Sequence, residues 1–227
     1  MALIFLIRHG ENEYTRTGKL AGWTKGVSLN ETGQKQAQAL AARLKHLPIK
    51  QLYSSPLERA QETAAPLAQA LGLTVQVREG LGEVGYGEWT GQSLKVLARK
   101  KLWRVVQGLP SAMQFPAGET IRAAQLRLVD TLEGIARDHP KEMVAVFSHS
   151  DPIKLAVAFY LGAPLDLFQR IQIQTCSVTV ISLGQGAPSL VKLNDTGPFE
   201  APRPHPRKGK PPHKRQPAQR RGGPPRG

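Results

Sequence analysis

Two stretches of consecutive apolar residues constrain the fold of this chain more than any other feature. Residues 2–7 read ALIFLI, and the segment EMVAVFSHS over 142–150 contains a second such run. Neither run shows the alternation of polar and apolar residues that is typical of a strand with one exposed face. Strands buried on both faces occur in parallel sheets that helices cover on both sides. The two runs therefore predict an α/β protein with a largely parallel sheet.

Helix-like and strand-like segments alternate through residues 2–193. The clearest helix is predicted over 29–48, with Asn30 as its N-cap and an apolar face with helical spacing. The next helix is predicted to start with Ser55 as cap and Pro56 as first helical residue, and to end at Gly72. Further helices are predicted over 92–107, 120–138 and 152–161, and further strands over 51–55, 73–77, 170–174, 177–183 and 189–193. Such alternation predicts a three-layer α/β/α sandwich.

The length and composition favour a single large domain. A chain of 227 residues, 40% of them hydrophobic, can bury one continuous core. The apolar run at 155–161 is too short to cross a bilayer, and the run at 2–7 lacks the basic leader of a signal peptide. Cys176 is the single cysteine and is interpreted as a small core residue. Because it cannot form an internal disulfide, we expect a cytoplasmic protein without membrane insertion.

The strong positive charge of the chain is concentrated at its C-terminal end. Residues 201–227 carry nine Lys or Arg, eight prolines and no acids, so about +5 of the net charge of +14 remains for the rest. This segment has no apolar periodicity and cannot bury enough surface to offset the entropy lost on ordering. We therefore predict one domain over 1–199 and a disordered basic, proline-rich tail over 200–227.

Cations and histidines follow three of the predicted strands. Arg8 and His9 follow the first strand, His149 follows the strand at 142–147, and Arg59 lies in the first turn of the helix after 51–54. Ligands of open parallel sheets bind beyond the carboxyl ends of the strands. If these three strand ends are neighbours, two imidazoles and two guanidiniums converge, and a phosphoryl group is the natural guest for such a cluster. No metal-ligand spacing is present, so neither a metal nor another cofactor is expected.

Five motifs, in order and without large gaps, resemble those of the histidine phosphatase superfamily, also called phosphoglycerate-mutase-like. They read LIRHGENE, SSPLERAQETA, LGEVGYGEWTG, FPAGET and FSHSDPIKLAVA, and the resemblance covers about residues 3–193. It implies the phosphoglycerate-mutase-like fold and a phosphatase that acts, without a metal, on a small phosphorylated metabolite.

The resemblance also implies roles for individual residues. His9 would attack phosphorus to form a phosphohistidine, and Glu83 would protonate the leaving oxygen and then accept a proton from water. Arg8, Arg59 and His149 would hold the phosphoryl oxygens. Two chemical expectations accompany these roles: His9 should donate its second ring N–H to a fixed backbone carbonyl, and Glu83 should have a raised pKa.

The loop over 12–22 and the residue after His149 depart from the family pattern. Thr15 replaces an asparagine that helps to bind the phosphoryl group, Ala21 replaces a small polar residue, and Ser150 stands where glycine is common. Thr15 keeps a hydroxyl donor, and the backbone N–H groups of Ala21 and Gly22 remain available. Thr15 and Gly22 are therefore carried over as expected phosphate-binding residues.

Two other functions remain open at this stage. The resemblance also extends to phosphoglycerate mutases, and the basic residues Lys95, Arg99, Lys100, Lys101 and Arg104 could bind an acidic substrate or simply form a solvated helix face. The alternative from another class is a polyanion-binding module, in which the basic tail binds RNA or an anionic surface weakly and without specificity.

Three side chains near the predicted site have two interpretations each. Trp89 and Tyr86 could line the mouth of the site or hold the loop in place. Glu119 could be a first-turn carboxylate of the following helix or could orient Arg8 or Arg59.

Overall fold

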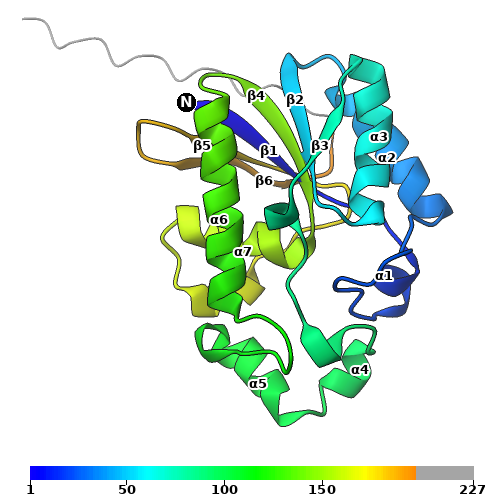
Figure 1. Ribbon diagram of the computed structural model, residues 1–227, viewed down its shortest axis with the longest axis vertical. Helices are drawn as coiled ribbons and strands as arrows, with labels where there is room; N and C mark the ends of the chain where they lie inside the picture. Colours follow the sequence, from blue (N-terminus) through cyan, green and yellow to red (C-terminus); the bar gives the residue numbers. More distant parts are fainter. Residues whose placement is uncertain (198–227) are drawn as a thin grey trace, which may run out of the picture.

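A six-stranded sheet forms the middle layer of the computed structural model, which describes residues 1–197 (Figure 1). The strands lie in the order β3-β2-β4-β1-β5-β6. Every pairing from β3 to β1 is parallel, whereas β5 is antiparallel to both β1 and β6. The sheet is therefore largely parallel, as predicted, with β5 running in the opposite direction. The strands are β1 (Ala2–Arg8), β2 (Ile49–Ser54), β3 (Val75–Val77), β4 (Met143–Ser148), β5 (Val178–Leu183) and β6 (Ser189–Asp195).

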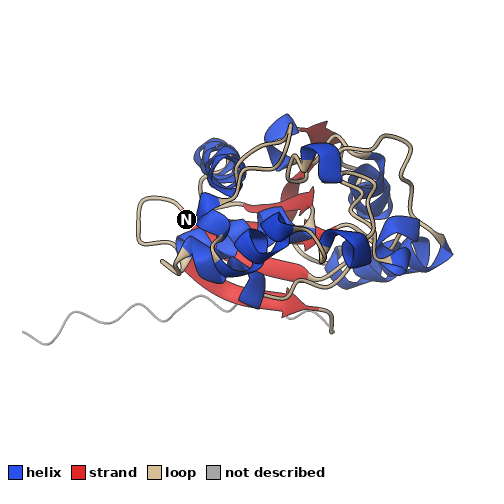
Figure 2. Cartoon of the chain, turned by 90° about the horizontal axis from the view of Figure 1, so that it is seen from below, coloured by secondary structure: helices blue, strands red, loops and turns tan. Residues whose placement is uncertain are grey.

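Helices cover both faces of the sheet, as the view from below shows (Figure 2). α2 and α3 pack on one face, and α6 and α7 pack on the other. The predicted three-layer α/β/α sandwich is thereby confirmed. These helices are α2 (Glu31–Leu44), α3 (Glu58–Leu71), α6 (Ile121–Asp138) and α7 (Ser150–Tyr160).

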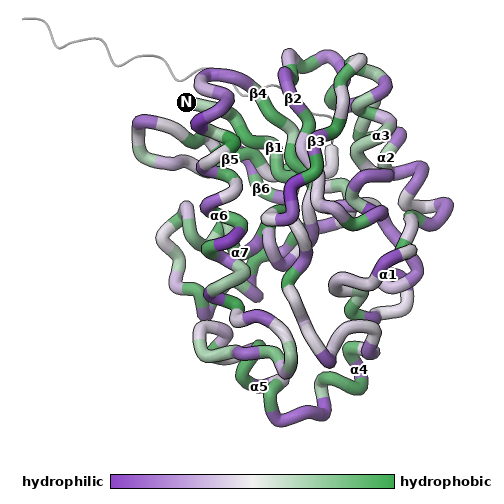
Figure 3. Tube along the Cα trace, viewed as in Figure 1, coloured by the Kyte–Doolittle hydropathy of each residue, from purple (hydrophilic) through white to green (hydrophobic). Residues whose placement is uncertain are grey.

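The apolar run of β1 faces both helical layers in turn. Ile4 and Leu6 lie in the core cluster with α6 and α7, whereas Phe5 and Ile7 lie in the cluster with α2 and α3. All four side chains are fully buried. From Ala2 to Ile7 the strand is consequently apolar at every position rather than at every second one, and the trace is green along β1 and β4 (Figure 3).

Helix ends agree with the predictions at two of three positions. The Asn30 side chain accepts a hydrogen bond from the Gly33 N–H and caps α2. Gly72 ends α3 in the left-handed conformation, with φ of 65°. The predicted start of α3 is wrong: Leu57 is the N-cap residue, and Ser55 and Pro56 precede the helix. Ser55 instead makes a contact in the candidate site described below.

Smaller elements form a cap at the carboxyl ends of the strands, seen at the bottom of Figure 1. The helix predicted over 92–107 is wrong as one element, because the chain turns at Ala98–Lys100 and forms two helices. The backbone of Lys100 is extended, with ψ of 145°, so the helical hydrogen bonds cannot continue through it. The elements of the cap are α1 (Glu13–Thr17), α4 (Leu94–Leu97) and α5 (Lys101–Gly108), with 3₁₀ helices η1 (Glu79–Leu81), η2 (Gly87–Trp89), η3 (Pro110–Ala112) and η4 (Leu165–Arg170).

The strand predicted near 170–174 is absent. The chain leaves η4 and runs without a ladder partner to β5. One carbonyl of this segment, that of Ile173, accepts a hydrogen bond from the Arg8 guanidinium. The segment therefore supports a side chain rather than extending the sheet.

The ends of β2, β4 and β1 lie side by side, as the sequence analysis assumed. Arg8 pairs with Ser148 in the β1–β4 register, and the His9 N–H donates to the Ser148 carbonyl over 3.0 Å. On the other side of β4, the Ser55 N–H donates to the Phe147 carbonyl over 2.9 Å. The polar residues that follow these strands thus gather at one edge of the sheet.

The predicted tail over 200–227 lies outside the described residues. Within residues 1–197, none of the helices combines the length and the hydrophobicity that a bilayer crossing would require.

Candidate active site

His9 stands at the end of β1 and is held in one ring orientation. Its side chain is 4% exposed, and its Nδ1 lies 2.7 Å from the carbonyl oxygen of Gly10. A carbonyl can only accept, so Nδ1 carries the proton, and a neutral ring keeps a free lone pair on Nε2. Burial, together with the charges of Arg59 and Arg8, holds the pKa of His9 well below its ordinary value. The expected backbone carbonyl partner is confirmed, and it leaves the ring neutral with the Nε2 lone pair free.

Two guanidiniums reach the same place from β1 and α3. Arg8 donates from Nη1 to the Ile173 carbonyl over 2.6 Å, and Arg59 donates from Nη2 to the Gly22 carbonyl over 2.8 Å. Each guanidinium uses one nitrogen for a hydrogen bond to a backbone carbonyl. Nε of Arg8 and both Nε and Nη1 of Arg59 are buried without a hydrogen-bond partner among the described residues. Burial lowers the pKa of both side chains. Free N–H donors in this forked arrangement match the oxygens of a phosphoryl group.

His149 precedes α7 and lies against His9, with ring centroids 5.2 Å apart. Its Nε2 lies 2.7 Å from the Ser55 hydroxyl oxygen, and its buried Nδ1 has no partner among the described residues. Burial and the charge of Arg59 hold the pKa of His149 well below its ordinary value. When the Ser55 hydroxyl donates to Nε2, the neutral ring carries its proton on Nδ1 and can donate it to an anion. Sequence analysis missed this role of Ser55, which looked like a helix cap.

The loop after β1 presents Asn12 rather than Thr15 as the free donor. Asn12 is 1% exposed; its Oδ1 accepts from the Thr15 N–H and hydroxyl, and its Nδ2 has no partner among the described residues. Thr15 lines the cavity, but its hydroxyl is used in this contact. Gly22 does not line the cavity; it adopts φ of 51° and supplies the carbonyl that holds Arg59. Sequence analysis missed Asn12. The signal was an asparagine only three residues before Thr15, which replaces the asparagine of the family.

Glu83 lies on the glycine-rich loop and faces the two arginines. Its side chain is 8% exposed, and its Oε1 accepts from the Val84 N–H over 3.0 Å. Burial, reinforced by the negative charge of Asp151, raises its pKa to about 7, although Arg59 and Arg8 act in the opposite direction. The expected raised pKa is confirmed. A carboxyl group with this pKa can give and take a proton near neutral pH.

The backbone of the Glu83 loop is fixed from α6. The Arg127 guanidinium donates to the carbonyls of Gly80, Gly82 and Glu83 and pairs with Glu119 at 2.8 Å. Glu119 also accepts from the Gly85 N–H over 2.6 Å. Both interpretations of Glu119 are wrong: it precedes the Thr120 cap of α6, and it binds the loop directly at Gly85 and pairs with Arg127 rather than with Arg8 or Arg59. Arg127 carried no recognisable signal in the sequence.

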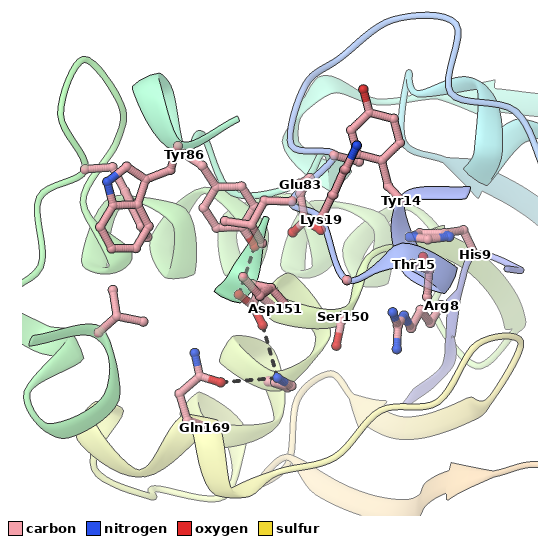
Figure 4. A pocket seen from close by; sticks show the side chains of 18 of the residues that line it. Arg8, His9, Tyr14, Thr15, Lys19, Glu83, Tyr86, Ser150, Asp151 and Gln169 are labelled. Carbon is pink, nitrogen blue, oxygen red and sulfur yellow. Dashed lines mark hydrogen bonds and ion pairs between the residues drawn. The ribbon is translucent and has the colours of Figure 1, made fainter. Parts of the chain in front are cut away.

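Five of these side chains line one end of a cavity of about 300 Å³ (Figure 4), whereas His149 contacts His9 and is not a lining residue. Asp151, Lys154 and Gln169 form a polar wall on the side of α7 and η4. The wall toward the cap is aromatic and aliphatic, and Tyr86 and Trp89 both line the cavity and are buried, so they hold the loop as well. The five basic residues of the α4–α5 segment are exposed and do not line the cavity. The residues at the cationic end are Arg8, His9, Asn12, Arg59 and Glu83.

Among residues 1–197, no group of three or more His, Cys, Asp or Glu side chains is arranged to hold a metal ion. Cys176 is buried, and burial raises its pKa to about 12, which fits the predicted core role.

Comparison with known proteins assigns the chain to one family. The family model of the histidine phosphatase superfamily (branch 1) matches residues 4–196. Phosphoserine phosphatase 1 of Hydrogenobacter thermophilus is 30% identical over 86% of this chain and 93% of its own length. The 2,3-bisphosphoglycerate-dependent phosphoglycerate mutase of Thermoplasma acidophilum is 28% identical over 82% and 90%. A solved phosphoserine phosphatase from Entamoeba histolytica, in complex with phosphoserine, superposes with a TM-score of 0.79 at 26% identity, over 86% and 98% of the two chains.

Proposed function

The chain belongs to the histidine phosphatase superfamily, and from that membership we propose that its cavity hydrolyses small phosphomonoesters through a phosphohistidine formed on His9. One observation supports this function above the rest. The neutral ring of His9 has its Nδ1 proton engaged by the Gly10 carbonyl. The free donors of Arg8, Arg59 and Asn12 belong to residues that line the same end of the cavity, and His149 lies against the His9 ring, so a phosphoryl group bound there would face Nε2.

In the first half of the reaction, the leaving group is exchanged for His9. The Nε2 lone pair attacks phosphorus, the bond from phosphorus to the ester oxygen breaks, and that oxygen takes the proton of the Glu83 carboxyl group. The guanidiniums of Arg8 and Arg59 hold the non-bridging oxygens, with His149 donating from Nδ1. Burial keeps these donors away from water. In a site without water, their charge acts more strongly on the transition state.

In the second half, water replaces His9 on phosphorus. Glu83, now a carboxylate, takes a proton from water, the oxygen of that water attacks phosphorus, and the bond to Nε2 breaks. Inorganic phosphate leaves, and both His9 and Glu83 return to their starting forms. General acid–base catalysis supplies ~10²–10⁴-fold. Phosphomonoester hydrolysis is accelerated by up to ~10²¹-fold in enzymes, so the positioned cations must supply a large share.

Mutase chemistry is less well supported, although one relative is named a phosphoglycerate mutase. A mutase must hold an acidic substrate while the phosphoryl group moves between two of its oxygens. The α4–α5 segment would supply cations for that purpose, but its five basic side chains are exposed and outside the cavity. Outside the cationic end, the lysines that line the cavity are Lys19 and Lys154, and Lys154 is already paired with Asp151.

The test is phosphate release from a panel of phosphomonoesters. p-Nitrophenyl phosphate should be hydrolysed in the presence of EDTA and inhibited by vanadate, and His9→Ala should abolish turnover without lowering the unfolding temperature. O-Phosphoserine belongs on the panel because two relatives are named for it. Conversion of 3-phosphoglycerate to its 2-isomer faster than hydrolysis of any ester would favour the mutase instead.

We also propose that the protein acts in the cytoplasm and that its basic tail binds polyanions weakly and without specificity. The single cysteine supports the first proposal, and the nine cations of residues 201–227 support the second. The tail contains no aromatic residue for stacking on bases. Removing the residues after Phe199 should leave kcat unchanged, and any affinity for RNA should fall steeply with salt and vanish with the tail.

A further inference from the structure

Asp151 connects the second histidine to the loop of the general acid. It lies two residues after His149, in the first turn of α7, and its side chain lines the cavity (Figure 4). Its Oδ2 accepts a hydrogen bond from the Tyr86 hydroxyl over 2.8 Å, and its Oδ1 pairs with the Lys154 ammonium at 3.1 Å. Tyr86 is 4% exposed and follows Glu83 by three residues. The contact therefore joins α7 to the loop that carries Glu83.

The remaining contacts of this loop hold its backbone rather than its cavity side. Arg127 and the Trp23 indole N–H both donate to the Glu83 carbonyl, over 3.1 and 2.7 Å. They fix where the loop runs, but neither reaches the carboxyl group. The Tyr86–Asp151 hydrogen bond is made inside the cavity, on the side of the loop that faces substrate.

Charges from several elements act on the Glu83 carboxyl group. The cations favour its ionised form, and Asp151 and burial favour its protonated form. Burial is the largest contribution, and Asp151 is the next. Tyr86 stays protonated, because burial and the carboxyl groups of Asp151 and Glu83 raise its pKa well above the ordinary value. The titratable and charged groups around Glu83 are Arg8 and His9 of β1 and its end, Arg59 of α3, Arg127 of α6, His149 and Asp151 at the start of α7, and Tyr86 of the same loop.

We propose that Asp151 is a positioning residue: it fixes the acid loop through Tyr86, and its negative charge keeps Glu83 protonated until the leaving oxygen takes the proton. This inference rests on the proposed function of Glu83. Asp151 does not touch the reacting atoms and acts through Tyr86 and Glu83. Asp151 is paired with Lys154, whose ammonium group also lies 3.3 Å from Gln169 Oε1.

Three variants separate the charge of Asp151 from its hydrogen bond. Asp151→Asn removes the charge and keeps an acceptor for Tyr86. Tyr86→Phe removes the hydrogen bond and keeps the charge. Lys154→Met removes the cation that offsets Asp151, so its effect on Glu83 should be opposite in sign to that of Asp151→Asn.

The measurement is the pH profile of kcat/KM with phenyl phosphate and p-nitrophenyl phosphate. The two esters have the same ring, but phenolate is a much more basic leaving group and depends more on protonation by Glu83. In the wild-type enzyme, kcat/KM for phenyl phosphate should fall above the pKa of Glu83. Asp151→Asn should move this fall to lower pH; a displacement of one pH unit corresponds to about a tenfold loss at high pH. Lys154→Met should move it to higher pH, and Tyr86→Phe should lower kcat without moving it to lower pH. With p-nitrophenyl phosphate the fall itself should be shallower, because nitrophenolate leaves with less need of a proton.

Two outcomes overturn the inference. One is a fall in kcat/KM at the same pH in Asp151→Asn, Lys154→Met and the wild type; the other is a fall that is as deep with p-nitrophenyl phosphate as with phenyl phosphate. If Asp151→Asn does not fold, Lys154→Met alone decides by the same criterion. Failure of the proposed function looks different, because wild-type protein would then release no phosphate in a His9-dependent manner.

Discussion

Replacing Arg59 by methionine should destroy activity while costing the ligand-free protein little stability. Arg59 is 1% exposed and is among the largest fully buried side chains. A buried side chain of this size would ordinarily be expected to stabilise the fold. Here, however, the guanidinium makes one hydrogen bond, to the Gly22 carbonyl, and has two nitrogens without partners among the described residues.

The activity loss follows from the two free nitrogens. Nε and Nη1 of Arg59 can each donate one charge-assisted hydrogen bond to a phosphoryl oxygen, worth ~1.5–3 kcal/mol. Two such bonds amount to about 3–6 kcal/mol, which corresponds to a fall of about 10²–10⁴-fold in kcat/KM.

The stability change is the difference of two opposing terms. Arg59→Met leaves the Gly22 carbonyl without its donor, which costs ~1–3 kcal/mol. It also removes a buried charge whose desolvation costs several kcal/mol, and methionine fills much of the same volume. The ligand-free variant should therefore unfold at a temperature no lower than that of the wild type.

The assay combines kinetics with thermal unfolding in the presence of inorganic phosphate. At 100 times its dissociation constant, phosphate stabilises the wild-type protein by about 2.7 kcal/mol, a rise of about 5–10 °C for a chain of this size. Arg59→Met should lose most of this rise. Arg59→Lys is the matched control, because it keeps the charge without the fork and should fall between the two. The reasoning is refuted if Arg59→Met keeps kcat/KM within tenfold of wild type, or if phosphate stabilises it as strongly.

Three further outcomes follow from the buried site. Ser55→Ala should lower kcat/KM about 10–100-fold with little change in unfolding temperature, because the ring tautomer of His149 is no longer fixed; unchanged kinetics would show that Ser55 does not orient it. Glu83 has a pKa raised to about 7 in the folded state, so its contribution to stability is full below its unfolded pKa and is lost as pH rises through 7. Glu83→Gln should therefore be more stable than wild type by up to about 3 kcal/mol at pH 8, and denaturant titrations at pH 4 and pH 8 should show the difference disappearing in acid. Cys176 should react with iodoacetamide at pH 8 only after unfolding, because burial raises its pKa to about 12; fast labelling of the native protein would contradict its core position.

The parts of the fold that depend on side-chain type alone were predictable from the sequence. The apolar run of β1 predicted a strand buried on both faces, and Asn30 and Gly72 predicted helix ends. Ser55 was assigned wrongly because a serine before a proline has the same local signature whether it caps a helix or binds a distant ring. In this protein Ser55 binds a distant ring, that of His149, which lies 94 residues further along the chain. Local signals contain no information about such a partner.

The same limit applies to the catalytic loop. The five motifs identified Glu83, yet the loop is held by Arg127 and Glu119, which are recognisable only once α6 lies against it.

The site keeps its phosphate donors unsatisfied at a cost to the folded state, and this cost explains why it can stabilise a transition state. Each buried N–H without a partner destabilises the free protein, and among residues 1–197 Arg8, Arg59 and His149 each have at least one nitrogen without a partner. The protein tolerates this because the rest of each side chain is fixed: Arg8 by the Ile173 carbonyl, Arg59 by the Gly22 carbonyl and His149 by Ser55. A donor fixed in this way does not have to reorient when charge develops on the phosphoryl oxygens, so its whole hydrogen bond is available to the transition state. A site in which these donors paired with protein acceptors would be more stable and would have to break those pairs before it could bind phosphate.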